Sequence, residues 1–112
     1  MEHSYSLVIP PYFDGNNYAY WKVRMKAFSK SIDERVWNSV EYGWKKPTTP
    51  VSEWQTSQKE VATFNNKVMN AIFNAVSMKE FKRISNVEVA YTAWNILQIM
   101  HKGTKVVKIN KL

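Results

Sequence analysis

The sequence predicts an all-α protein, a compact bundle of five to six helices preceded by an extended N-terminal arm. First, apolar residues recur at spacings of three and four over most of the chain. Second, three capping boxes of the form Ser-x-x-Glu/Gln, starting at Ser52, Ser77 and Ser85, mark expected helix starts. Third, 45% of the 112 residues are apolar, with five Trp, six Tyr and five Phe, so one core can form without cysteine, which the chain lacks. We therefore expect a single domain, with an arm and turn at 1–16 and the bundle at 17–112.

The arm and the first two helices follow from turn and periodicity signals. Pro10 and Pro11 favour an extended arm, and the following Asp-Gly-Asn favours a tight turn, after which Asn16 or Asn17 caps the first helix. This helix has apolar residues at one helical spacing: Tyr18, Trp21, Met25, Phe28 and Ile32. A second helix is expected over about 33–42, with Val36, Trp37 and Val40 inward and Gly43 as its stop.

Three further helices are predicted after a proline-bounded loop at 44–51. The long one should begin at the Ser52 box and end near 75 or 76, with an apolar stripe of Trp54, Val61, Phe64, Val68, Ile72 and Ala75. The Ser77 box predicts a short helix to Ile84. The Ser85 box predicts a helix with Val87, Ala90, Trp94 and Leu97 inward, ended by Gly103. From Thr104 a new helical pattern starts and the chain stops within it, as expected of a truncated piece of a longer protein.

The residues that enzymes use for catalysis do not form a recognisable pattern. The two histidines, His3 and His101, are far apart in sequence, and neither has the partner four residues away that a helical metal site needs. No phosphate loop, dinucleotide fingerprint or nucleophile elbow occurs. We expect no enzyme activity, no metal, no cofactor and no small-molecule substrate, with His101 solvated at a helix end. No leader peptide or membrane span is predicted, so we expect the protein in the cytoplasm or also the nucleus.

Positive charge is concentrated at the C-terminal end. The formal net charge is +7, and residues 79–112, with seven Lys or Arg and two Glu, account for +5 of it. Such a region can contact nucleic acid, weakly and without sequence preference, and the alternative is an ordinary solvated helix face. The candidate nucleic-acid contacts are Lys79, Lys82, Arg83, Lys102, Lys105, Lys108 and Lys111.

Two blocks of residues resemble a known family. The pattern Phe13-x-Gly15-x-x-Tyr18-x-x-Trp21-x-x-x-Met25 resembles the opening of the Gag protein of Copia-type LTR retrotransposons, which are abundant in plant genomes. Trp94, Leu97 and Gly103 resemble a later block of the same family. The resemblance implies a retroviral-capsid-like N-terminal lobe that assembles into particles packaging RNA, or a copy retained by the host. The zinc knuckle of such proteins requires cysteine and does not carry over to this chain.

Self-association is therefore the leading functional expectation, with at least a dimer expected. The candidate contacts are Trp44 in the proline-flanked loop and the terminal set of Val106, Val107, Ile109 and Leu112, which a short terminal helix cannot bury alone. The alternative for Trp44 is packing against Trp37 or Trp54 beneath the loop. The competing functions are RNA or DNA binding through the basic end and binding of a host protein or peptide.

Overall fold

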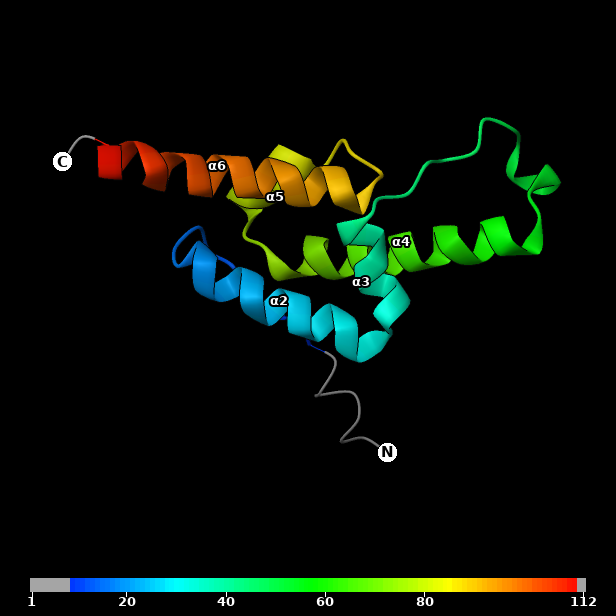
Figure 1. Ribbon diagram of the computed structural model, residues 1–112, viewed down its shortest axis with the longest axis horizontal. Helices are drawn as coiled ribbons and strands as arrows, with labels where there is room; N and C mark the ends of the chain where they lie inside the picture. Colours follow the sequence, from blue (N-terminus) through cyan, green and yellow to red (C-terminus); the bar gives the residue numbers. More distant parts are fainter. Residues whose placement is uncertain (1–8, 111–112) are drawn as a thin grey trace.

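Five α-helices make up most of the chain that the computed structural model describes, namely the backbone of residues 9–110 and the side chains of residues 9–102 (Figure 1). They are α2 (Tyr18–Ile32), α3 (Glu34–Glu41), α4 (Thr56–Ala75), α5 (Met78–Ile84) and α6 (Ala90–Asn110), with a short 3-10 helix at Val51–Glu53. The prediction of an all-α bundle of about five helices is confirmed.

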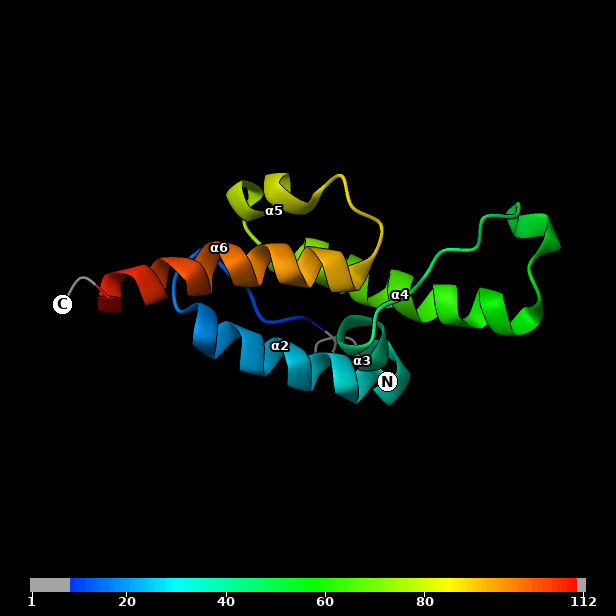
Figure 2. The same ribbon diagram turned by 45° about the horizontal axis from the view of Figure 1, so that its top comes forward.

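The helices enclose one core. Helices α2, α4 and α6 are the long members, and α3 packs against all three of them, while α5 packs on α6 (Figures 1 and 2). Each helix turns its apolar stripe inward, as its periodicity predicts. The buried large side chains come from the arm and from each of the five α-helices: Phe13, Trp21, Met25, Val36, Trp37, Val68, Ile72, Ile84, Trp94 and Leu97.

The N-terminal arm is tied to the junction between α4 and α5. The Phe13 backbone N–H donates to the Ala75 carbonyl at 2.6 Å, and the Ser77 N–H donates to the Phe13 carbonyl at 2.9 Å. Two residues earlier in the arm, the Pro11 carbonyl accepts the Trp21 indole N–H at 2.8 Å. These bonds hold the arm against the bundle, so that the Phe13 side chain is 1% exposed.

Several predicted helix ends are confirmed. Asn17 precedes α2 in the left-handed conformation (φ 57°) but makes no side-chain capping bond. Asp33 caps α3 by accepting the Arg35 backbone N–H at 2.8 Å, and Gly43 follows the helix with φ +85°. Ser77 caps α5, with its hydroxyl oxygen 3.4 Å from the Glu80 N–H.

The predicted start of the long third helix is wrong. Helix α4 begins at Thr56, and the Gln58 side chain accepts the Gln55 backbone N–H at 2.7 Å. Trp54 lies before the helix because its indole donates to the Thr49 carbonyl at 2.9 Å, which keeps this stretch in the loop. Val61 is 46% exposed, so it does not belong to the buried stripe.

The predicted start of the helix that carries Trp94 is also wrong. Ser85 is the C-cap of α5, and α6 begins at Ala90. The buried Asn65 of α4 supplies the cap: its amide accepts the Ala90 N–H at 2.8 Å and donates to the Glu88 carbonyl at 2.7 Å. Asn65, which lies 25 positions before Ala90, thus caps α6 in place of the capping box expected at Ser85.

Gly103 does not end a helix, contrary to the prediction, and no separate helix begins at Thr104. Helix α6 continues through this glycine to Asn110. A glycine inside a helix costs about 1 kcal/mol relative to alanine, which the surrounding turns of a long helix can offset.

Candidate functional site

The residues that carry the family resemblance meet in the core. Phe13 stacks on Trp21 with ring centroids 4.9 Å apart and meets Tyr18 edge-on at 5.7 Å. Trp21 in turn stacks on Trp94 at 5.5 Å, and Trp37 of α3 meets Trp94 edge-on at 5.2 Å. Because all five rings are buried, this part of the signature stabilises the fold and presents no surface of its own.

The other signature residues have structural roles as well. Met25 and Leu97 are fully buried. Gly15 has φ +105°, and a methyl group placed on its Cα would lie 3.3 Å from Glu80 Oε2, so a side chain there would be strained and crowded. Gly103 lies within α6, beyond the residues whose side-chain surroundings the structure describes.

A buried carboxylate joins α5, α6 and the turn after the arm. Glu80 is 1% exposed, and its Oε1 lies 2.9 Å from His101 Nε2 and 3.4 Å from Arg83 Nε. The His101 ring also stacks on Tyr18 at 5.4 Å and meets Phe13 edge-on at 4.8 Å. The expectation that His101 is solvated is therefore wrong: it packs on the aromatic core and binds a carboxylate. The Ser77 box does indicate Glu80 near a helix start, but no local signal indicates its distant partner.

Tyr18 contributes a buried hydroxyl to the same region. The side chain is 8% exposed, and its oxygen has no hydrogen-bond partner among the described residues. Burial raises the pKa of the Tyr18 phenol to about 12, because a phenolate would lose its hydration there. This tyrosine therefore acts as an aromatic packing residue with an unsatisfied polar atom.

A basic groove lies beside this cluster, between the start of α2 and the later part of α6. Its volume is about 880 Å³, and its charged lining residues are Lys22, Arg83 and Lys102. Burial and the nearby Lys102 ammonium lower the pKa of Lys22. Four of the candidate nucleic-acid contacts are thus placed: Arg83 and Lys102 line the groove, and Lys82 is exposed on α5. Lys79 is also exposed on α5. No local pattern in the sequence indicates Lys22 as part of this groove, because it lies 80 positions before Lys102.

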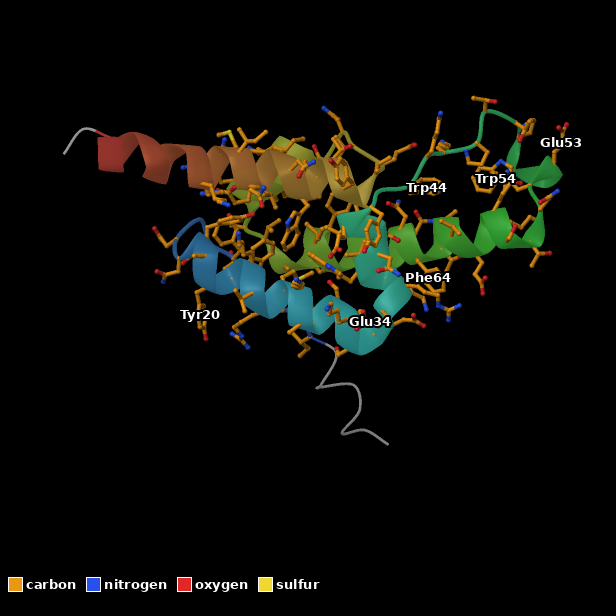
Figure 3. All side chains as sticks on the ribbon, in the orientation of Figure 1. Tyr20, Glu34, Trp44, Glu53, Trp54 and Phe64 are labelled. Atoms are coloured by element: carbon orange, nitrogen blue, oxygen red, sulfur yellow. The ribbon has the colours of Figure 1, made fainter. Side chains whose placement is uncertain are left out.

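Trp44 packs against its neighbour across the loop. Its ring meets the Trp54 ring edge-on at 6.4 Å, which is one of the two packings considered from sequence (Figure 3). Both indoles line a hollow of about 640 Å³ between the 44–55 loop and α4, together with Val51 and Phe73. Trp44 remains partly exposed, so its use as a contact with another copy is still a prediction.

Exposed apolar side chains gather around Gly43, where α3, α4 and α6 meet. Tyr42 is 76% exposed and lines a shallow depression together with Gly43 and Val61. A methyl group placed on Gly43 would lie 3.6 Å from Tyr91 Cβ, and Tyr91 is 44% exposed. We call Tyr42, Val61 and Tyr91 the Gly43 patch. The sequence analysis missed it because α3 and α6 are separated by about fifty positions.

The remaining candidate residues lie outside the part of the chain whose side chains are described. They are Val106, Val107, Ile109 and Leu112 of the proposed self-association set and Lys105, Lys108 and Lys111 of the basic set. For residues 103–110 the structure gives the backbone, which is helical.

No metal-binding group is found within residues 9–102: no three His, Asp or Glu side chains lie together there in a way that could hold an ion. Over the described chain, no helix is both long and apolar enough to cross a membrane. Comparison of the chain with protein-family models, with curated proteins and with solved structures finds no match.

Proposed function

We propose that this chain is a structural assembly module that associates with further copies of itself, as a Gag-like capsid N-terminal lobe does. The observation that carries the proposal is the Gly43 patch, in which Tyr42, Val61 and Tyr91 are each at least 44% exposed around one glycine. Exposed apolar side chains that gather in one region mark interaction sites in soluble proteins. Tyrosines are also favoured at protein interfaces because they combine an apolar ring with a polar end.

The resemblance to Copia-type Gag proteins supports the same conclusion. Its aromatic signature residues, together with Met25 and Leu97, lie in the buried core, as expected of residues that maintain the shape of a building block. Under this proposal the working surface of the module lies outside the signature, on exposed residues such as those of the Gly43 patch. The terminal set Val106, Val107, Ile109 and Leu112 remains a second proposed contact.

Light scattering over a concentration series tests the proposal. We expect the full chain to show a mass that rises toward that of a dimer or larger assembly as concentration increases. Tyr42→Ser and Tyr91→Ser should each shift this rise to higher concentration, because each removes an apolar ring from the contact. Tyr20→Ser is the matched control, because Tyr20 is 65% exposed on α2 and points away from the bundle (Figure 3). A parent that stays monomeric throughout would contradict the proposal, as would equal effects of all three variants.

Non-specific nucleic-acid binding is the second candidate function. The observation in its favour is that Lys79 and Lys82 are exposed on α5 and form no ion pair with any described residue. Binding of this type should weaken steeply as salt rises, because it depends on release of counterions from the phosphate backbone. A measured affinity that does not change with salt would argue against it.

A further inference from the structure

The basic groove between α2 and α6 brings together two lysines that pair with no acidic side chain of the described residues. Lys22 lies one turn into α2, and Lys102 lies far along α6; in both ribbon views the first turns of α2 lie beside this later part of α6 (Figures 1 and 2). The two ammonium groups are close enough for Lys102 to depress the pKa of Lys22, after the larger effect of burial. Among the described residues neither lysine forms an ion pair.

Like charges brought together by a fold are unfavourable unless something compensates them. Arg35 and Lys46 have carboxylate partners, Asp33 and Glu88, each at 3.0 Å, whereas the Lys22 ammonium nitrogen lies 5.9 Å from the centroid of the neutral Tyr18 ring. Lys22 and Lys102 differ from the other unpaired lysines in lining one groove together, where a bound anion would supply the compensating negative charge.

The acidic groups nearest the groove do not cancel its charge. Glu80 is buried beneath the groove and is already engaged by Arg83 and His101. Asp14 lies before the groove residue Gly15, and one of its oxygens accepts the Asn16 backbone N–H at 2.9 Å. Arg83 is paired with Glu80, and among the described residues neither Glu80 nor Asp14 forms an ion pair with Lys22 or Lys102.

The backbone at the start of α2 adds to this positive character. The first turn of α2 contains no acidic residue, and Asn17 makes no side-chain capping bond to it. The unpaired N–H groups at a helix start, together with the helix dipole, favour an anion there. Asn16, Asn17 and Tyr18 from this end of the helix all line the groove.

We propose that this groove is a binding site for a multiply charged phosphate group, held between the Lys22 and Lys102 ammonium groups at the start of α2. A phosphate chain of two or more charges matches two adjacent cations better than a single carboxylate does. The same phosphate chemistry can come from a free polyphosphate compound or from the backbone of a nucleic acid. The site is independent of the Gly43 patch.

The test uses the full chain and three probes at constant ionic strength: sodium tripolyphosphate, ATP and a short oligouridine RNA. Calorimetry should show saturable binding of tripolyphosphate. Lys22→Gln and Lys102→Gln should each weaken it about tenfold, the effect expected from loss of one charge-assisted contact. Lys45→Gln is the matched control, because Lys45 is exposed in the loop and does not line this groove. It should change the affinity by less than about twofold, as expected of a screened, distant charge.

The three probes distinguish the source of the phosphate. Tighter binding of the RNA than of tripolyphosphate, with competition between them, would identify a nucleic-acid backbone as the source. Tighter binding of tripolyphosphate or ATP would identify a free polyphosphate compound.

Melting temperatures without ligand separate a binding defect from a folding defect. Without ligand, Lys22→Gln and Lys102→Gln should melt at or above the melting temperature of the parent, because each removes the repulsion between the two ammonium groups. When tripolyphosphate is added, the melting temperature of each variant should rise less than that of the parent. Equal tripolyphosphate affinity in the parent, Lys22→Gln, Lys102→Gln and Lys45→Gln would overturn the proposal. So would the absence of saturable binding of any of the three probes.

Discussion

His101 Nε2 lies 2.9 Å from Glu80 Oε1, so that a histidine late in α6 satisfies a carboxylate buried at the start of α5. The pair spans 21 positions in sequence and is covered by the aromatic rings of Phe13 and Tyr18. It therefore joins the arm, α2, α5 and α6 at one point, and it is the polar centre of an otherwise apolar region.

Removing the Glu80 carboxylate should destabilise the protein. Glu80→Ala leaves His101 and Arg83 without their shared acceptor and opens a small cavity, so we expect a loss of about 2–4 kcal/mol in the free energy of unfolding, measured in urea. Glu88→Ala is the control: its ion pair with Lys46 is solvent-exposed on both sides and should contribute about 1 kcal/mol or less. Equal losses for the two variants would mean that the buried pair has no special role.

The Tyr18 hydroxyl should contribute little or nothing to stability. Because this buried oxygen has no partner among the described residues, Tyr18→Phe should leave the melting temperature unchanged or raise it, by up to about 1 kcal/mol in unfolding free energy. The pKa of about 12 adds a second readout, since ultraviolet titration of the parent should contain a tyrosine that ionises late and that the variant lacks. A loss of more than about 1 kcal/mol would reveal an ordered water bound to the hydroxyl.

The stacked pair Trp21 and Trp94 should be essential to the fold. The rings are 2% and 9% exposed, so Trp21→Ala and Trp94→Ala should each cost about 3–5 kcal/mol in unfolding free energy, most of the stability of a small domain. Because the rings touch, the double variant should lose less than the sum of the single variants. Strictly additive losses would contradict direct coupling between the two rings.

Acid should weaken the cap of α3. The Arg35 side chain and backbone N–H groups hold the pKa of Asp33 at about 2, below its usual 3.8. A depressed folded-state pKa means that the stabilisation is complete above about pH 4 and is lost as pH falls toward 2. Asp33→Asn should therefore flatten the decline of melting temperature between pH 4 and 2, relative to the parent. An unchanged profile would show that this aspartate does not carry the dependence.

Much of this architecture follows from local sequence. The spacing of Trp21 and Met25, the cap at Asp33, the stop at Gly43 and the cap at Ser77 each predicted a feature that the structure has. These features depend on residues a few positions apart, and helix periodicity and capping are interactions over such distances.

Tertiary structure decided what depends on residues far apart in sequence. Asn65 starts α6 at Ala90 in place of the Ser85 box, because a buried amide from α4 satisfies the backbone there. His101 is withdrawn from solvent because its ring binds Glu80 and packs on the aromatic core. Lys22 and Lys102 line one groove because side chains of α2 and α6 stack on each other, as Trp21 does on Trp94. The sequence by itself determined the helices and which of their faces are apolar. The pairing of those faces determined the Asn65 cap of α6, the Glu80–His101 pair and the basic groove, because such contacts form only once the chain has brought distant residues together.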